Sequence, residues 1–182
     1  MVKYGLILAG ICFAAALVLS LVYRVTEPKI EEARRREEEA ARRELLPAAE
    51  AFEKRSAGGM EYYAGLSGGR AVGYCFPASG RGYGGFLKLM VGIDPEGKIA
   101  GVRVLEHQET PGLGAKIVEV RPGESEPWFL AAFRGLPARR IGLKDIQAIT
   151  GATITSRAVV EAVRGGAESF PLPAVPEGGS GR

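Results

Sequence analysis

A seven-residue segment near the C-terminus has the residue types needed to hold a phosphate ester. It reads TGATITS, residues 150–156, and a helical pattern follows at once over residues 157–163. Free backbone N–H groups at the positive end of a helix bind phosphate, and one of the hydroxyl side chains could also carry the ester covalently. The alternative is a threonine that caps the start of an ordinary helix.

A second segment, HQETPGLG at residues 107–114, has the composition of a loop that accommodates a flat ligand. Leu113 lies between two glycines, so the backbone can approach a ligand closely while the leucine packs against its face. Glu109 and Thr110 add an acceptor and a hydroxyl at the mouth of the loop. An ordinary turn between a strand and a helix is the alternative.

Glycine also dominates a third segment, GRGYGG at residues 80–85. It lies between two stretches rich in strand-forming residues. A β-hairpin turn is the simplest interpretation, and a loop that lines a ligand is the alternative.

Strand-forming residues predict a small antiparallel sheet that positions these segments. Strands are expected at 71–77, 86–93 and 99–106. The turn signal DPEGK at 94–98 joins the last two of them. The pattern therefore predicts an antiparallel meander.

Two helices are expected beside this sheet. WFLAAF at 128–133 predicts a short helix that ends before Gly135 and Pro137. Residues 154–167 have the apolar face of a longer helix. Together these elements predict an α+β domain of roughly 120 residues.

The N-terminal segment predicts a membrane span. Residues 5–23 contain no charged side chain, and as a helix they would extend roughly 28 Å, close to the thickness of a bilayer core, about 30 Å. A cleaved signal peptide is the alternative, but no small-x-small cleavage site follows the apolar run. We therefore expect a retained single transmembrane helix.

Composition divides the rest of the chain. Glutamate, arginine and alanine dominate the segment after the span and predict a solvated helical stalk, whereas proline and glycine predict disorder at the C-terminal end. The predicted boundaries are 1–25 for the transmembrane anchor, 26–47 for the charged stalk, 48–170 for the α+β domain and 171–182 for a flexible tail.

Charge and motif content argue against several functions. The 182 residues include 24 basic and 21 acidic ones, for a net charge of +3, and no basic stripe interleaved with aromatic residues indicates nucleic-acid binding. Two cysteines and one histidine define neither a disulfide framework nor a metal site. The sequence also lacks a nicotinamide fingerprint and a nucleophile–histidine pair, so we expect no catalytic residues of a stand-alone enzyme.

The order of these motifs resembles the G subunit of the Rnf complex, a family with a covalent FMN-binding domain. The resemblance rests on the membrane span, the charged stalk, GYCF…GRGYGG, HQETPGLG, WFLAAFRG and TGATITSRAV. It extends over nearly the whole chain, from residue 1 to about residue 170. The C subunit of the sodium-pumping NADH:quinone reductase has a similar FMN-binding domain.

The resemblance implies a cofactor, FMN, and a site for it. A flavin transferase with FAD as donor would attach FMN by a phosphoester to the last threonine of the [S/T]GAT motif, which is Thr153. Thr155 and Ser156 are expected to donate hydroxyl hydrogen bonds to the phosphate. The expected cofactor-binding residues are Thr153, Thr150, Gly151, Ala152, Thr155, Ser156, Glu109, Thr110, Gly112, Leu113, Gly114, Tyr83 and Gly84.

The resemblance also implies a function. The chain would be an electron-transfer subunit of a membrane complex that couples ferredoxin:NAD oxidoreduction to ion translocation. Its partners would be the other membrane subunits and, during maturation, the flavin transferase. The alternatives are a C-type subunit of an NADH:quinone reductase and a non-redox binding module anchored to the membrane.

Two features depart from this pattern. Gln147 stands where family motifs often have an acidic residue six positions before the acceptor threonine, with Asp145 two residues earlier. Basic residues are also more numerous after the span than before it, which favours a cytoplasmic domain. Large domains translocate largely regardless of charge, and the resemblance implies an extracytoplasmic domain on the cytoplasmic membrane, so we expect that location.

Overall fold

The computed structural model describes residues 2–171 of the chain. They form two compact units that are divided after Glu39, within the predicted stalk. Apart from Pro171, the predicted tail at 171–182 lies outside the described residues.

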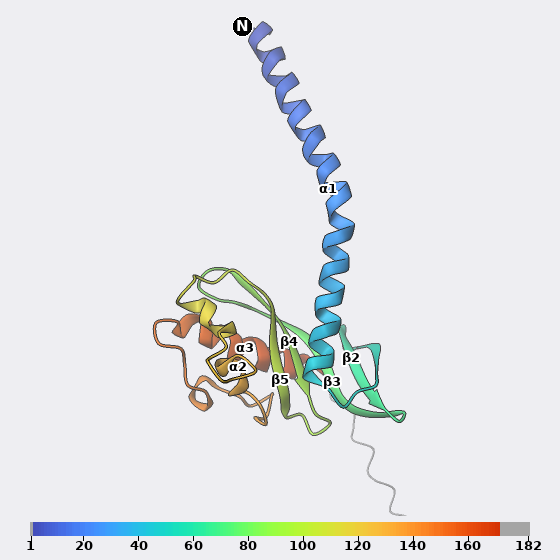
Figure 1. The fold of residues 1–182 in the computed structure, drawn as a ribbon, viewed down its shortest axis with the longest axis vertical. Coiled ribbons are helices and arrows are strands. Elements are labelled where there is room, and N and C mark those ends of the chain that lie inside the picture. Colours follow the sequence, from blue (N-terminus) through green and yellow to red (C-terminus); the bar gives the residue numbers. More distant parts are fainter. Residues whose placement is uncertain (1, 172–182) are drawn as a thin grey trace, which may run out of the picture. The chain divides into compact units, whose positions relative to one another are not determined.

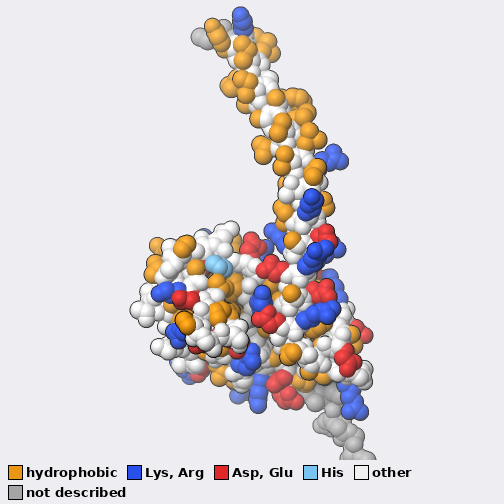
Figure 2. All heavy atoms as spheres, in the orientation of Figure 1, with side chains coloured by type: hydrophobic (Ala, Val, Ile, Leu, Met, Phe, Trp, Pro, Cys, Tyr) orange, Lys and Arg blue, Asp and Glu red, His pale blue; other side chains and the backbone are white. Residues whose placement is uncertain are grey.

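One long helix, α1 (Val2–Leu45), covers the predicted anchor from Val2 and the predicted stalk up to Leu45, two residues short of its predicted end. Its apolar part is long enough to cross a membrane, judged by length and composition, and none of it is buried. Apolar side chains cover the N-terminal half of the helix and charged ones follow (Figure 2). Pro28 removes one backbone donor, yet the helix continues on both sides of it. The predicted N-terminal apolar helix is thus confirmed.

Five antiparallel strands form a single sheet in the order β1-β2-β3-β4-β5 (Figure 1). Strands β3 (Arg70–Arg81), β4 (Phe86–Ile93) and β5 (Ile99–His107) cover the three predicted strands. The predicted antiparallel meander and the α+β class are confirmed.

Two more strands precede this meander, and neither of them was predicted from the sequence. They are β1 (Ala51–Ala57) and β2 (Met60–Ser67). Each ends in a pair of glycines, Gly58–Gly59 and Gly68–Gly69, all of which have positive φ. Consecutive left-handed residues make the tight turns that suit the twist of a hairpin. The two glycine pairs were therefore the overlooked signal for these strands.

The larger hydrophobic core lies between the sheet and α3 (Thr153–Ser169). This helix begins one residue before the predicted start. Phe170 packs here against Phe76, with ring centroids 5.3 Å apart. The short helix α2 (Trp128–Ala131) is shorter than predicted and adds further aromatic side chains to this core. Two 3₁₀ turns, η1 (Gly114–Val118) and η2 (Leu143–Asp145), complete the domain.

A smaller core covers the opposite face of the sheet. It consists of side chains from the end of α1 and from the strands beneath it, with the Arg42 guanidinium 3.9 Å from the centre of the Tyr63 ring. Cys75 is fully buried in this core, and its burial raises the pKa of the thiol to about 12. The residues of the smaller core are Ala41, Leu45, Leu46, Cys75 and Met90.

Candidate functional site

One cavity brings the three glycine- and hydroxyl-rich segments together. Its volume is about 460 Å³, and it lies between the β3–β4 loop, the loop after β5 and the start of α3. Most of the predicted cofactor-binding residues line it, and Ile154 lines it in addition. The lining residues are Tyr83, Glu109, Thr110, Leu113, Gly114, Gly151, Ala152, Thr153, Ile154 and Thr155.

The carboxylate of Glu109 links all three segments. The side chain is only 6% exposed. Its Oε2 accepts a hydrogen bond from the hydroxyl of Thr155 (2.7 Å), and its Oε1 accepts one from the backbone N–H of Gly84 (3.3 Å). A buried carboxylate needs such donors to offset its loss of hydration, so Glu109 fixes the relative positions of the two loops and the helix.

Glycines provide the room that Glu109 occupies. A Cβ atom at Gly82 or Gly114 would collide with the Glu109 carboxylate, and one at Gly84 would collide with the carbonyl oxygen of Gln108. The β3–β4 loop does form the predicted hairpin turn, with Gly82 N–H donating to Gly85 O (2.9 Å). The glycines therefore serve close approach between segments as well as the turn.

Thr153 is the first residue of α3 and is exposed to solvent. The N-cap is Ala152, and no side chain caps the helix. The first helical hydrogen bond is donated by Ser156 N–H to Ala152 O (2.9 Å). The N–H groups of residues 153–155 therefore have no intrahelical partner. The threonine cap considered from the sequence is not formed, and these N–H groups are available to an anion.

The hydroxyls of Thr155 and Ser156 are used differently from what the sequence analysis expected. Both side chains are buried. The Ser156 hydroxyl donates to Ala152 O and accepts from Ile149 N–H, both at 3.0 Å, while Thr155 donates to Glu109. Their hydroxyl protons are therefore engaged within the protein rather than free for a phosphate. They hold the chain that leads into α3.

Besides Ser156, three predicted residues do not line the cavity. Thr150 is exposed outside it. Gly112 has a φ of 76°, a left-handed conformation that glycine adopts without strain, and it shapes the loop after β5. Gly84 contributes through its N–H bond to Glu109. Gly151, which does line the cavity, has a similar φ of 79° and turns the chain into α3.

The rim of the cavity is apolar. Tyr83, Leu113 and Ile154 are all exposed there. Exposed apolar side chains around a cavity with a few placed polar groups are typical of a site for a largely apolar ligand. Among residues 2–171, no cluster of His, Cys, Asp and Glu side chains could hold a metal ion.

Comparison with protein families matches both units of the chain. Residues 82–168 match the FMN-binding domain, and residues 1–45 match the RnfG N-terminal region. The fold and the site thus define a protein with an FMN-binding domain behind a long apolar helix.

Two relatives, similar along most of their length, narrow this class to one family. The G subunit of the proton-translocating ferredoxin:NAD(+) oxidoreductase complex of Clostridium ljungdahlii is 33% identical over 84% of this chain and 82% of its own. The G subunit of the Na(+)-translocating ferredoxin:NAD(+) oxidoreductase complex of Acetobacterium woodii is 38% identical over 88% of this chain and 87% of its own. The chain belongs to the family of Rnf complex G subunits.

Solved structures of a related subunit are also similar. NqrC of Shewanella oneidensis has a TM-score of 0.47 and 26% identity, over 58% of this chain and 54% of its own. The C subunit of the Na(+)-translocating NADH-quinone reductase of Parabacteroides distasonis has a TM-score of 0.49 and 23% identity, over 61% of this chain and 60% of its own.

Proposed function

We propose that this protein carries FMN covalently on Thr153 and relays electrons within an Rnf-type complex that couples ferredoxin:NAD oxidoreduction to ion translocation. The observation that carries the proposal is the exposed Thr153 at the uncapped first turn of α3, on the wall of the 460 Å³ cavity. Membership of the family of G subunits supports the electron-transfer role.

The attachment step would be a phosphoryl transfer with FAD as the donor. The Thr153 hydroxyl oxygen forms a bond to the phosphorus of the FMN half, and the pyrophosphate bond of FAD breaks. AMP leaves and the hydroxyl proton is released, so no oxidant or reductant is needed. A flavin transferase would catalyse the step.

The start of α3 suits the resulting phosphodiester. The N–H groups of residues 153–155 lack intrahelical partners, and the positive end of the helix dipole stabilises an anion there. Gly151 and Ala152 are small and leave space beside the attachment point. These groups would hold the phosphate in place of the Thr155 and Ser156 hydroxyls.

The cavity suits the rest of the cofactor. Its volume lies within the range of about 300 to 1,000 Å³ of small-molecule sites. Tyr83, Leu113 and Ile154 would supply apolar contacts, and Glu109 would keep the two loops and the helix in register. FMN supplies the electron-transfer chemistry when bound, while the protein supplies position and electrostatics.

In-gel flavin fluorescence tests the attachment. The full-length chain, co-expressed with a flavin transferase, is expected to give a fluorescent band that survives denaturation. Thr153→Ala should abolish the band, because it removes the acceptor oxygen. Thr150→Ser is the matched control, since Thr150 is also exposed but lies outside the cavity, and serine preserves the [S/T]GAT motif, so this variant should keep the band.

Two outcomes would contradict the proposal. A band that persists in Thr153→Ala would overturn the assignment of the acceptor. The absence of any band from the wild-type chain would favour the non-redox binding module.

The same assay tests whether Gln147 affects flavin attachment. Gln147 is exposed and lies outside this cavity, and Gln147→Glu places an acidic residue at that position.

We further propose a single-pass protein of the cytoplasmic membrane whose domain lies on the extracytoplasmic side. The buried Cys75 is a poor probe of this location, because its high pKa leaves almost no reactive thiolate at neutral pH. A thiol placed in the exposed β4–β5 turn, Glu96→Cys, is suitable. It should react in intact cells with a membrane-impermeant maleimide, and labelling only after lysis would place the domain in the cytoplasm.

A further inference from the structure

Strand β5 forms one edge of the sheet, and part of its outer side is unpaired. The start of the strand is covered, because Ile99 exchanges backbone hydrogen bonds with Gly135 (2.7 Å) and Leu136 (2.9 Å). Over residues 101–104 the backbone makes no hydrogen bond outside the sheet within the described part of the chain. Alternate residues of such a strand direct N–H and C=O away from the sheet, so this stretch offers free donors and acceptors.

A groove of about 510 Å³ follows this unpaired stretch. Its walls come from both faces of the sheet. Leu45 and Arg103 lie on the face covered by the end of α1, and Val104 and Leu130 pack with the larger core on the other face. A groove bounded by both faces at a free edge occupies the place that a sixth strand would take.

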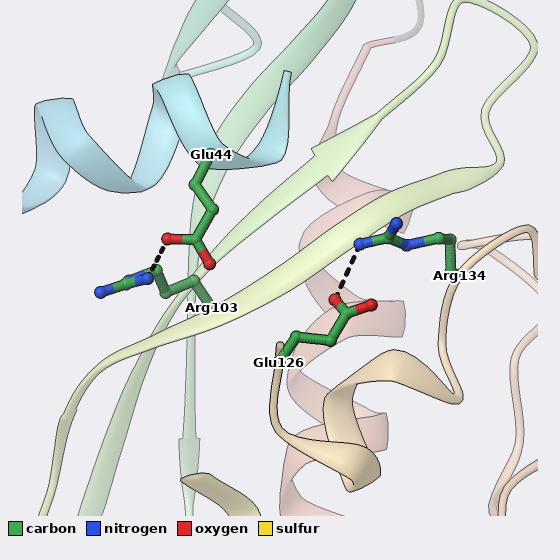
Figure 3. A network of polar contacts seen from close by, with 4 residues as sticks. All are labelled: Glu44, Arg103, Glu126 and Arg134. Carbon is green, nitrogen blue, oxygen red and sulfur yellow. Dashed lines mark hydrogen bonds and ion pairs between the residues drawn. The ribbon is translucent and has the colours of Figure 1, made fainter. Parts of the chain in front are cut away.

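Two ion pairs border the groove (Figure 3). One joins Glu44 at the end of α1 to Arg103 of β5, and the other joins Glu126 to Arg134 (2.7 Å) across α2. All four side chains are between 38% and 60% exposed. Exposed pairs contribute little to stability, so they can exchange partners with an incoming segment at little cost.

The side of the groove toward α2 carries apolar side chains beside the Glu126–Arg134 pair. Val118 and Val120 line it and are exposed, together with the buried Leu130. An occupant would therefore meet valines, a leucine and the Glu126–Arg134 pair on one side, and the Glu44–Arg103 pair on the other. The two sides of an extended chain alternate in the same way, because successive side chains point to opposite faces.

We propose that an extended segment of another subunit of the complex adds to β5 as a sixth strand in this groove. The identity of the partner as a neighbouring subunit rests on the proposed function. The segment forms backbone hydrogen bonds with residues 101–104. Its side chains alternate between apolar residues, which pack on Val118, Val120 and Leu130, and charged residues, which pair with Glu44 and Arg103.

Photocrosslinking in membranes that contain the assembled complex tests the partner. Benzoylphenylalanine in place of Val118 should cross-link to one contiguous segment of another subunit with this alternating pattern. The control position is Ala51, which is exposed on β1 at the other edge of the sheet, and it should not label that segment. Cross-links only to lipid or to a second copy of this chain would overturn the proposal.

A pair of charge substitutions tests the contact. Val120→Asp places a charge on the apolar side and should lower co-purification of the cross-linked subunit about tenfold or more, whereas Ala51→Asp should leave it unchanged. Val120→Ser should give a smaller loss. The fluorescent flavin band should remain in all three variants, so loss of docking is distinguished from failure of the proposed function. Unchanged co-purification in Val120→Asp would contradict the proposal.

Amide hydrogen exchange tests the backbone contact. Outward-facing amides of residues 101–104 should exchange about tenfold or more slowly in the complex than in the purified full-length chain, because a paired edge must open before it exchanges. Amides of β1 should exchange at the same rate in both. Equal exchange rates at residues 101–104 in the two samples would exclude an added strand.

Discussion

The two faces of the sheet are covered to very different extents. On one face, α3, α2 and the 3₁₀ turns bury a large aromatic core that includes Phe76 and Phe170. On the other face, among residues 2–171, the end of α1 and the residues that follow it pack against the strands, over the small core around Cys75. The candidate cofactor cavity belongs to the first face, and the free edge of β5 lies where the two faces meet.

This difference separates two kinds of binding site. The cavity beside Thr153 is held by a buried carboxylate with two donors and by glycines that permit close approach. Such a site is rigid before its ligand arrives, as a precisely positioned cofactor requires. The groove at β5 is bordered instead by exposed ion pairs and valines, which can rearrange around a partner. Substitutions on each face of the sheet test whether the heavily covered face is the more tightly packed of the two.

The largest effect is expected from Gly114→Val on the heavily covered face. A side chain there would collide with the Glu109 carboxylate and approach the Thr155 hydroxyl. Overpacking costs typically about 1 to 3 kcal/mol, and a buried polar group left without its partner costs about as much again. We expect the free energy of unfolding to fall by about 4 kcal/mol, measured by urea denaturation of the full-length chain in detergent.

Gly165→Val is the matched control for this substitution. Gly165 lies in α3, and a Cβ atom there would meet nothing within 4 Å. Its replacement should change stability by less than about 1 kcal/mol, because valine has a somewhat higher helix propensity than glycine. Equal losses in the two variants would mean that close packing around Glu109 is not what stabilises the cavity.

The next largest effect is a pH-dependent loss of unfolding free energy that comes from Cys75 on the thinly covered face. Burial raises the pKa of the Cys75 thiol from 9.0 to about 12, so the unfolded chain releases this proton at a lower pH than the folded one. The stabilising contribution is complete below pH 9 and is lost as the pH rises toward 12. The slope is about 1.4 kcal/mol per pH unit, which predicts a loss of about 2 to 3 kcal/mol between pH 9 and pH 11.

Cys75→Ala isolates this contribution. Burial also raises the pKa of the Tyr74 phenol, so the wild-type chain alone cannot assign the slope to the thiol. The difference in unfolding free energy between wild type and Cys75→Ala should be constant below pH 9 and shrink above it. A difference that stays constant up to pH 11 would mean that the small core admits water to the thiol.

Sequence patterns predicted the heavily covered face better than the thinly covered one. Apolar residues at strand and helix spacing predicted β3 to β5 and α3, because each of these elements buries a side in the large core. Strand β1 reads AFEKRSA and is mostly exposed, so no alternation marked it. The signals for β1 and β2 were the glycine pairs at 58–59 and 68–69, which form the turns after these strands.

Most of the residues that line the cavity could be predicted from the sequence, but the hydrogen bonds between them could not. The composition of the three segments drew attention to them, because glycines and hydroxyls stand out in any sequence, and the family resemblance then implied a common site around Thr153. The hydrogen bond from Thr155 to Glu109 joins residues on different elements, and only the packing of α3 against the loop after β5 determines it. Spacing along the chain therefore could not show that the Thr155 hydroxyl serves the carboxylate.

The smallest effect is expected from Thr155→Val, which removes that hydrogen bond and keeps the shape of the side chain. The carboxylate of Glu109, a residue that is only 6% exposed, would lose its 2.7 Å donor and retain the longer bond from Gly84 N–H. A buried acceptor without its donor costs about 1 to 3 kcal/mol, and we expect a loss near 2 kcal/mol by urea denaturation. Thr155→Ser keeps the donor and should lose less than Thr155→Val. If Thr155→Ser is instead the less stable variant, the methyl group rather than the hydroxyl holds the helix to the loop, and the cavity is closer in kind to the adaptable groove.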